Sequence, residues 1–289
     1  MFGRYATTMA GRSIIRNYKP ADNFTECMKY QLARPGLDRR ELRIPHPASF
    51  SKLAALTSKH FTRLLRSAGS SQISRSRPIY SIGRQRSIHP MTKHVNLSKE
   101  RAMCRAGSSF VLKTDVSQFY PSLYTHAVGW AVDPQLRKRA HWGNSASLGK
   151  QLDQALMDLD GKVSQGVPIG NDISFLLSEV VLAQVDKAVY RRHGSRAFRW
   201  FDDYEFAFDT SEDAEAALKA LSKELGKFRL RLNPKKTTIT RLPHPTQDEW
   251  QETLRRAGSA RVIDNSQNMV QYFDTAFRLR DRFPEEAVS

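Results

Sequence analysis

The amino-acid sequence predicts an α+β fold built around a split βαβ unit. Three observations carry this prediction: an apolar segment at 110–116 that contains an acid near its end, a long apolar helical pattern at 173–192, and an aromatic segment at 197–208 with the pattern of a hairpin. An amphipathic segment at 211–227 and a strand-like region at 230–239 follow. The order of strand, helix, hairpin, helix and strand is that of a split βαβ unit.

The composition indicates a nucleic-acid partner. The chain has 289 residues, with 46 Lys and Arg against 29 Asp and Glu, so its formal net charge is +17. Like charges repel, and a polyanion usually neutralises such an excess; nucleic acid is the leading candidate and an anionic membrane surface the other. No stretch approaches the roughly 20 apolar residues of a membrane-spanning helix, so no membrane partner is expected. Cys27 and Cys104, the two cysteines, have no metal-ligand spacing, which fits a reducing compartment.

The stretch between Glu41 and Glu100 contains no Asp or Glu. A solvated face normally mixes both signs, so this stretch predicts a phosphate-facing surface rather than a disordered basic tail. Helically spaced leucines after Ser51 predict a helix that ends at Gly69, and 70–83 has the pattern of loop and short extended pieces. The cations of the stretch are Arg43, Lys52, Lys59, Arg63, Arg66, Arg75, Arg77, Arg84, Arg86, Lys93 and Lys99.

Two helical regions are expected between the first strand and the hairpin. The segment 126–159 has apolar residues at helical spacing and includes a polar loop around 143–147. The longer helix at 173–192 is expected to begin at Asn171 or Asp172, because both residue types cap helix N-termini. A turn punctuated by glycines separates the two regions.

The last elements of this part surround a pair of acids. The segment 197–208 predicts two aromatic strands with the acids between them, and 211–227 predicts an amphipathic helix. Pro234 is expected to interrupt the final strand, because proline has no N–H for a β-ladder. The helix is expected to turn inward Leu218, Leu221 and Leu225.

The acids indicate metal chemistry. Asp115 follows an apolar strand, and Asp202 and Asp203 lie between two others. Burying carboxylates together is costly unless cations lie between them, and Mg²⁺ is usually held by one or two carboxylates plus substrate phosphates. An Asp-Asp pair alone is more often a solvated turn, but the aromatic residues at 199–201 and 204–208 favour a structured hairpin.

Four motifs in order resemble those of reverse transcriptases. They are DVSQFYPSL at 115–123, GVPIGNDIS at 166–174, WFDD at 200–203 and LNPKKT at 232–237. Since a motif needs its context, the ordered set is far more specific than any one of them. The run FYPSLYTHAVGW and the GVPIG motif most resemble bacterial phage-defence reverse transcriptases of the abortive-infection and unknown-group lineages. The resemblance implies a right-hand polymerase with a split βαβ palm, helical basic fingers and a truncated or minimal helical thumb.

The resemblance also implies a metal site. Asp115 and Asp202 would be the shared ligands of Mg²⁺ or Mn²⁺, with Asp203 as a supporting acid. The backbone carbonyl of Val116 would be a further ligand. Lys236 would protonate the leaving pyrophosphate, and the equal alternative is a solvated lysine that ends a strand.

Other positions would contact the incoming nucleotide. Tyr120 falls where the family has a bulky residue that excludes a ribose 2′-hydroxyl, and the alternative is a core tyrosine. Arg86 matches the position that grips the triphosphate, with Arg84 and Lys93 as competitors; arginine suits this role because it binds phosphate bidentately. The second motif would contribute Gly166, Pro168, Ile169 and Gly170.

Ile169 departs from the family pattern. Many reverse transcriptases have Gln there, whereas the defence lineages share this change, so unusual or template-independent DNA synthesis enters the hypothesis. His89, His94 and His126 form no recognisable ligand set and are expected to be structural or close to phosphate. Ser122 has no obvious His and Asp partners, so hydrolase chemistry is not supported.

The predicted domains are a basic N-terminal region and fingers at 1–109, a palm with interspersed fingers helices at 110–240, and a helical segment at 241–289. The last holds helical patterns at 247–257 and 269–283, which leave little room for a thumb. A partner protein or a second copy would then supply its function.

The leading hypothesis is an RNA-directed DNA polymerase, a nucleotidyltransferase of the bacterial cytoplasm that acts in antiviral defence. Its partners would be an RNA or DNA template-primer, deoxynucleoside triphosphates and a non-coding RNA. The alternative is a catalytically weak nucleic-acid-binding subunit with the same fold. A third hypothesis, an RNA-dependent RNA polymerase, is disfavoured by Tyr120.

Overall fold

The computed structural model describes residues 24–33, 39–81, 87–92, 96–138, 146–193, 196–246, 249–258 and 266–283. The chain divides into two compact units. The larger unit comprises Met1–Met28 and Arg43–Leu242, and the smaller comprises Lys29–Leu42 and Pro243–Ser289. The acids of the four motifs all belong to the larger unit.

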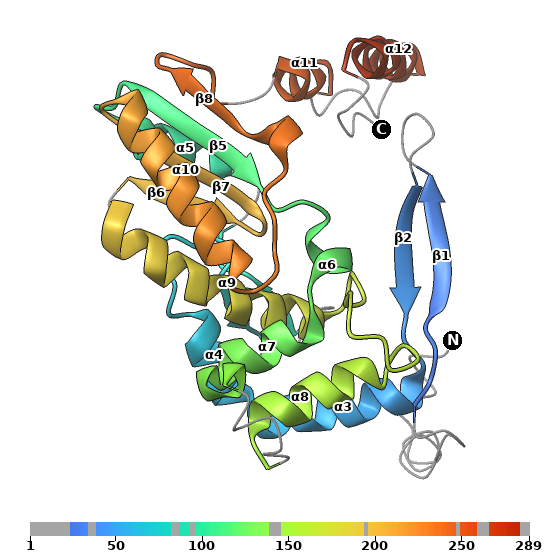
Figure 1. Ribbon diagram of the computed structural model, residues 1–289. Coiled ribbons are helices and arrows are strands. Elements are labelled where there is room, and N and C mark those ends of the chain that lie inside the picture. Colours follow the sequence, from blue (N-terminus) through green and yellow to red (C-terminus); the bar gives the residue numbers. More distant parts are fainter. Residues whose placement is uncertain are drawn as a thin grey trace. The chain divides into compact units, whose positions relative to one another are not determined.

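A four-stranded antiparallel sheet forms the centre of the larger unit (Figure 1). Its spatial order is β6-β7-β5-β8. Apolar residues face each other across the ladder: Leu112 of β5 pairs with Phe206 of β7 and with Ile239 of β8. This palm-type sheet in a mixed helix and strand fold confirms the predicted α+β class. The strands are β5 (Phe110–Asp115), β6 (Ala197–Trp200), β7 (Asp203–Phe208) and β8 (Thr238–Arg241).

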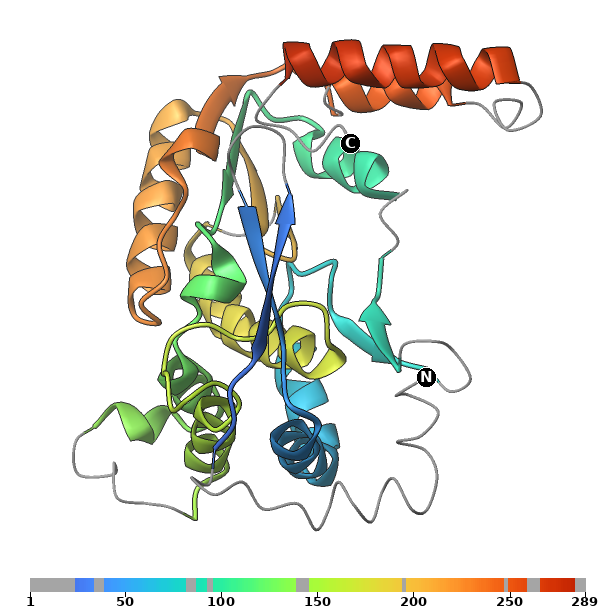
Figure 2. The ribbon, with the colours of Figure 1, turned by 90° about the vertical axis from the view of Figure 1, so that its right-hand side faces the viewer.

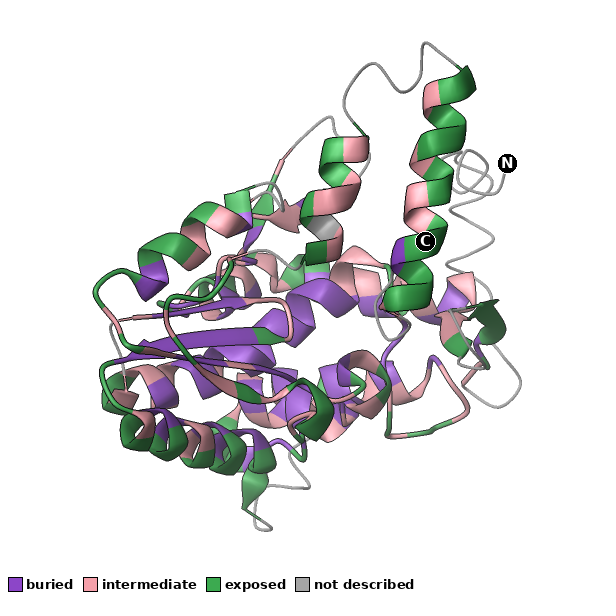
Figure 3. Cartoon of the chain, turned by 90° about the horizontal axis from the view of Figure 1, so that it is seen from above, coloured by how far each residue is buried: buried purple, intermediate pink, exposed green. Residues whose placement is uncertain are grey.

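Side chains of β7 alternate between two apolar layers, as the period of two in a strand requires. Tyr204 and Phe206 belong to the main core, which includes the long helix α9 (Asp172–His193) and α10 (Ser211–Gly226). Ala207 and Glu205 lie on the opposite face, toward α5 (Leu97–Arg105). Buried residues gather on the sheet and on α9 (Figure 3).

Helix α9 is apolar on nearly all sides, which is typical of a fully buried helix. As predicted, its N-terminus is capped: Asn171 Oδ1 accepts a hydrogen bond from Ser174 N at 2.8 Å. Helix α10 is capped in the same way by Thr210, which accepts from Asp213 N. Leu221 and Leu225 of α10 are buried, and Leu218 packs partly buried against the core, as predicted.

The basic N-terminal part differs from the prediction in its helices. The expected single helix from Ser51 to Gly69 is two helices, α3 (Pro47–Lys59) and α4 (Phe61–Ala68), separated at His60. The break lets α3 pack on α8 (Leu148–Met157) while α4 packs on α9, so tertiary contacts override the local pattern. The segment expected to be helical at 126–159 also contains α7 (Thr125–Val132) and the 3₁₀ helix η2 (Pro134–Arg137).

Two hairpins were not predicted. In one, β3 (Pro78–Tyr80) pairs with β4 (Ile88–Pro90) and contacts α9 (Figure 2). In the other, β1 (Met28–Ala33) pairs with β2 (Arg39–Ile44). Strands β1 and β2 are largely exposed, so they lack the alternation of buried and polar residues that identifies a strand.

The remaining short elements also refine the prediction. Pro234 does not merely interrupt a strand: it begins the 3₁₀ helix η4 (Pro234–Lys236), and the regular strand starts only at Thr238. In the smaller unit, α11 (Glu249–Ala257) and α12 (Ser266–Arg282) lie side by side (Figure 2). The four-residue helix α6 (Phe119–Ser122) follows β5.

Part of the acid-free stretch is neutralised within the fold. Arg43 pairs with Asp160 at 3.0 Å, Arg63 with Asp133 at 2.6 Å and Arg75 with Glu100 at 2.6 Å. These cations therefore also hold the basic segment to the rest of the chain. Among the residues that the structure describes, no helix is long and apolar enough to cross a membrane.

Helices α7 and α8 approach closely through two glycines. A Cβ at Gly149 would lie 2.5 Å from the carbonyl oxygen of Gly129. We expect Gly149→Ala to lower the free energy of unfolding by about 1–3 kcal/mol or more, as overpacking does. Urea denaturation would measure the loss. Gly226→Ala is the control, because a Cβ there meets no described atom within 4 Å; equal losses would contradict the close packing.

Candidate active site

The sheet brings the three acids of the first and third motifs to one edge. Asp115, the last residue of β5, lies directly opposite Asp203, the first residue of β7. The N–H of Val116 donates to the carbonyl oxygen of Asp202 at 3.2 Å. The pairing of β5 with β7 therefore places Asp115 and Asp203, which are 88 positions apart in the sequence, next to each other.

The turn between β6 and β7 has an unusual backbone. Phe201 has φ +53°, in the left-handed region that a bulky residue rarely adopts. Such a conformation costs about 1–3 kcal/mol and persists only when the surroundings hold it. The Phe201 ring packs against Phe175 of α9, with ring centroids 5.4 Å apart, and against Trp200 at 5.0 Å. The surroundings thus fix the residue that precedes the Asp pair.

Asp115 is buried and has one carboxylate oxygen engaged. Its Oδ2 lies 3.2 Å from Nζ of Lys236, a side chain that remains 59% exposed. Its Oδ1 is buried and has no hydrogen-bond partner among the described residues. A buried carboxylate oxygen without a donor is costly, and a bound cation would remove that cost.

The neighbouring acids Asp202 and Asp203 have raised pKa values, because burial and nearby carboxylates disfavour their charged forms. Burial and the charge of Asp115 raise the pKa of Asp202. Burial and the charge of Asp202 raise the pKa of Asp203 to about 7. The side chain of Asp203 reaches solvent at the turn, and solvent screens part of this repulsion.

These residues fit a divalent cation that substrate oxygens help to hold. No group of three or more His, Cys, Asp or Glu side chains in the described ranges is close enough to hold a metal ion without other ligands. Mg²⁺ needs only one or two carboxylates when substrate phosphates complete its coordination. The unpartnered oxygen of Asp115 beside Asp202 meets that lower requirement.

The fourth motif positions Lys236 beside the acids. The N–H of Asn233 donates to the carbonyl oxygen of Asp115 at 2.9 Å, and Oδ1 of Asn233 accepts from the N–H of Lys235. Thr237 and Thr114 share a hydrogen bond between their hydroxyls at 2.7 Å. These bonds fasten η4 alongside β5, so the ion pair of Lys236 with Asp115 follows from the backbone arrangement.

The second motif folds back on the first. The N–H of Gly166 donates to Leu123 O at 2.9 Å, and the N–H of Val167 donates to Tyr120 O at 3.0 Å. Gly166 has φ +91°, a backbone conformation that favours glycine, and a Cβ there would also lie 3.1 Å from the carbonyl oxygen of Pro121. Gly170, at φ +98°, is exposed beside the N-terminus of α9.

The remaining residues of this motif differ in burial. Pro168 is buried, and its carbonyl oxygen accepts a hydrogen bond from the side-chain amide of Asn171 at 2.9 Å. Ile169 is partly exposed between Pro168 and Gly170. The motif therefore presents Ile169 and Gly170, and not Pro168, at the surface.

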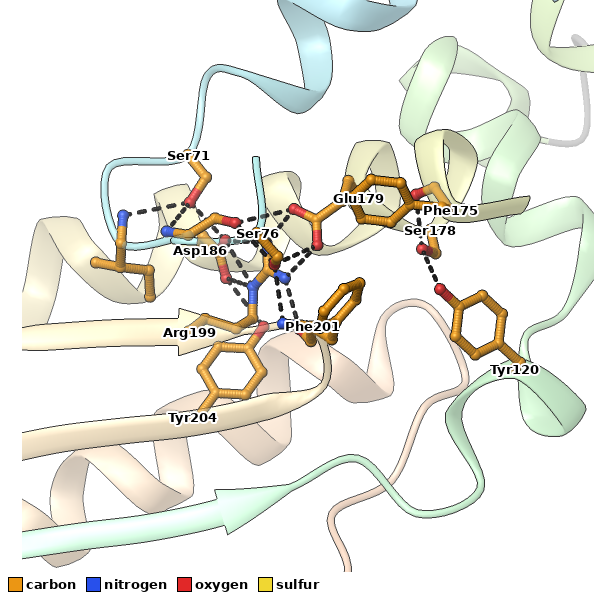
Figure 4. Close-up of polar contacts among 12 residues, drawn as sticks. Ser71, Ser76, Tyr120, Phe175, Ser178, Glu179, Asp186, Arg199, Phe201 and Tyr204 are labelled. Carbon is orange, nitrogen blue, oxygen red and sulfur yellow. Dashed lines mark hydrogen bonds and ion pairs between the residues drawn. The ribbon is translucent and has the colours of Figure 1, made fainter. Parts of the chain in front are cut away.

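Tyr120 is part core residue and part surface residue. It is half-buried, packs against Phe119 with ring centroids 5.2 Å apart, and its hydroxyl accepts a hydrogen bond from Ser178 of α9 at 3.4 Å (Figure 4). These contacts are those of a residue packed at the border of the core, and the role of Tyr120 beside a nucleotide stays a prediction. Arg86, with its competitors Arg84 and Lys93, lies outside the described residues.

The histidines have structural partners. Nδ1 of His126 contacts Asp153, which is buried and also accepts from the Thr125 hydroxyl. Nδ1 of His89 lies 3.5 Å from the hydroxyl of Ser81. His94 lies outside the described residues. His126 and His89 thus have partners within the fold.

Sequence analysis missed a buried ionic network behind the site. Arg199 of β6 is fully buried and pairs with Glu179 and Asp186 of α9, each at 2.8 Å (Figure 4). A signal was present: the two acids are seven positions apart, and therefore on one face, in an otherwise apolar helix. A second contact that was not predicted involves Asp172. Its Oδ2 accepts from the N–H groups of Ser87 and Ile88 and so anchors β4.

The strain among the acids predicts a pH effect on stability. Because the pKa of Asp203 is raised in the folded state, the folded protein binds more protons than the unfolded chain between about pH 4 and pH 7, and stability falls as the pH rises through that range. Without divalent ions, Asp203→Asn should raise the thermal midpoint at pH 8 more than at pH 4. Asp274→Asn, at an exposed position of α12, is the charge-matched control; an equal gain from it would contradict the prediction.

Comparison with known proteins identifies the family. The family model described as reverse transcriptase (RNA-dependent DNA polymerase) matches residues 49–272. No curated protein matches the chain. Among solved structures, apo telomerase from Candida tropicalis truncated from its C-terminal domain is similar, with a TM-score of 0.50 and 12% identity over 78% of this chain and 51% of that one. Apo telomerase from Candida tropicalis has a TM-score of 0.51 and 11% identity over 84% of this chain and 49% of that one.

The present chain therefore spans about half the length of these structures, and at this identity the likeness shows the fold alone. The family model extends from α3 into α12 and includes all four motifs. This chain belongs to the reverse transcriptase family.

Proposed function

We propose that this chain is a DNA polymerase that adds deoxynucleotides to a nucleic-acid 3′ end, directed by RNA. The observation that carries the proposal is the placement of Asp115 and the pair Asp202 and Asp203 at one edge of two adjacent strands. Family membership makes such a nucleotidyltransferase the expected activity. The net charge of +17 supports a nucleic-acid substrate.

The three acids would have different roles, because their environments differ. Two bound Mg²⁺ or Mn²⁺ ions would activate the 3′-hydroxyl and stabilise the leaving pyrophosphate. Asp115, with its unpartnered Oδ1, and Asp202 would be the shared ligands, and the carbonyl of Val116 would add a further oxygen. Asp203 would keep the local field negative at the open end of the turn.

Lys236 is placed for two successive tasks. In the metal-free protein its ammonium offsets the charge of Asp115 at 3.2 Å. With cations bound at the acids, the exposed ammonium of Lys236 would give a proton to the departing pyrophosphate. This role requires the exposure that the side chain has.

The nucleotide would lie against Tyr120 and the second motif. The hydrogen bond from Ser178 and the contact with Phe119 fix the orientation of the Tyr120 ring, which a steric gate needs. Ile169 and Gly170 would contact the base or the template, and an apolar side chain at Ile169 offers no hydrogen bonds there. We propose Arg86 as the triphosphate-binding cation of the β3–β4 connection.

The biological setting rests on the resemblance of the first and second motifs to bacterial phage-defence reverse transcriptases. We accordingly propose antiviral defence in a bacterial cytoplasm, with a non-coding RNA or a template-primer as partner. Ile169 supports a capacity for synthesis without a template.

The central test is nucleotide incorporation by purified protein. Wild type should incorporate deoxynucleotides in the presence of Mg²⁺ or Mn²⁺, and the double variant Asp202→Asn, Asp203→Asn should lose at least about 1,000-fold, because each acid stabilises charge in the transition state. The matched control is Glu215→Gln, Asp274→Asn, which removes the same charge from exposed positions.

Reactions with and without RNA template would separate copying from untemplated synthesis. Absence of incorporation by folded wild type that still binds RNA would favour the alternative, a nucleic-acid-binding subunit. Activity retained by the double Asp variant would contradict the proposed site.

A second prediction concerns the sugar. Tyr120→Ala should reduce the preference for deoxynucleotides over ribonucleotides by about 10-fold or more, since one removed steric group changes discrimination by that order. Tyr120→Phe keeps the ring and removes the hydroxyl that accepts from Ser178. It should retain the preference. The ratio of kcat/KM values for the two sugars measures both effects, and equal ratios in all three proteins would rule out the gate.

A further inference from the structure

We propose that Ser76 and Arg199 form a clamp that positions the turn carrying Asp202 and Asp203. Neither residue is placed to touch a nucleotide, because both are fully buried. Each instead contacts the backbone of Phe201, the residue before the acids (Figure 4). The inference rests on the proposed function and adds to it the elements that set the geometry of the acids.

The clamp holds Phe201 from both sides of its backbone. The N–H of Phe201 donates to the hydroxyl of Ser76 at 2.8 Å. The carbonyl oxygen of Phe201 accepts from Nη1 of Arg199 at 2.6 Å. These two bonds act at the one residue of the turn that has a left-handed backbone, so they oppose its relaxation to an ordinary conformation.

Arg199 is itself held in one orientation. A guanidinium has five N–H groups. Nε donates to Asp186, Nη2 to both Asp186 and Glu179, and Nη1 to Glu179 and to Phe201 O. Every N–H is therefore used, and a lysine could not reproduce this fork.

Hydroxyl groups donate hydrogen bonds to the carboxylates of the network and so stabilise its excess negative charge. One guanidinium faces two buried carboxylates, Glu179 and Asp186. A buried, uncompensated charge is costly, and charge-assisted hydrogen bonds reduce that cost. Such bonds come from the hydroxyls of Ser71 and Tyr204 to Asp186, and from those of Ser74 and Ser76 to Glu179.

The serines also connect the turn to the segment that leads into β3. Ser74 and Arg199 form a parallel β-bridge, and the N–H of Arg75 donates to the carbonyl oxygen of Arg199 at 2.8 Å. The segment 73–75 thus runs along β6 as an added strand, and Pro78 begins β3 directly afterwards. A shift of this segment would pass to Phe201 through Ser76, and from Phe201 to the acids.

The two buried serines permit a matched test. Ser76 and Ser71 both donate to an acid of the network, but of the two only Ser76 is bonded to the turn. Ser76→Ala should lower kcat by roughly 10- to 100-fold with little change in the KM for the nucleotide, since small misplacement of reacting groups costs that much. Ser71→Ala should lower kcat less than about 3-fold. Its thermal midpoint should fall by about as much as that of Ser76→Ala.

A second readout does not depend on catalysis. Mn²⁺ binding, measured by electron paramagnetic resonance in the presence of a non-hydrolysable deoxynucleoside triphosphate, should weaken about 10-fold in Ser76→Ala and remain unchanged in Ser71→Ala, as expected for a residue that orients metal ligands. Arg199→Lys should weaken Mn²⁺ binding at least as much as Ser76→Ala does. If Arg199→Lys does not fold, the result with Ser76→Ala decides whether the clamp exists.

The outcomes separate the two proposals. Wild type that binds Mn²⁺ through Asp115 and Asp202 but makes no DNA would contradict the proposed function, and the Mn²⁺ comparison would still decide the clamp. Equal effects of Ser76→Ala and Ser71→Ala on both kcat and Mn²⁺ affinity would overturn the clamp. So would unchanged values in Ser76→Ala, or wild type that binds no Mn²⁺ at these acids.

Discussion

The arrangement of the acids depends on the buried guanidinium of Arg199. Its guanidinium joins α9, through Glu179 and Asp186, to the carbonyl oxygen of Phe201 in the turn. The backbone of Arg199 adds the 73–75 segment through the β-bridge with Ser74. A buried ion pair contributes little net stability, because desolvation cancels much of the attraction. What it supplies is geometry, since few other arrangements satisfy all of its N–H groups. The turn can therefore hold a strained Phe201 and two repelling acids.

Several strained features lie together where chemistry is proposed. Phe201 has a left-handed backbone, Asp115 has an unpartnered buried oxygen, and Asp203 has a raised pKa, all at one edge of the sheet. Elsewhere in the larger unit, buried polar groups such as Glu205 and Asp153 have partners. The site has an unfavourable free energy without cations, and a well-packed part of the fold supports it. Bound cations and substrate would offset that unfavourable free energy.

Sequence patterns predicted the elements whose burial is regular. The strand at Phe110–Asp115, the long helix α9 and the hairpin at Ala197–Phe208 follow their apolar periods, and the capping residue Asn171 was among the expected ones. The β1–β2 hairpin and the break at His60 could not be predicted in this way. One is exposed and lacks a period, and the other arises because α3 and α4 pack on different helices. The Arg199 network needed three-dimensional contacts, although the spacing of its acids was visible.

The proposed site has Asp115 and Asp202 as ligands of one cation. The most direct measurement is the anomalous scattering of Mn²⁺ in crystals grown with a non-hydrolysable deoxynucleoside triphosphate. We expect a peak about 2.0–2.3 Å from carboxylate oxygens of both residues, the range for hard divalent cations bound by oxygen. Loss of that peak is expected in Asp202→Asn. Peaks bound elsewhere in wild type, with both carboxylates free of metal, would contradict the claim.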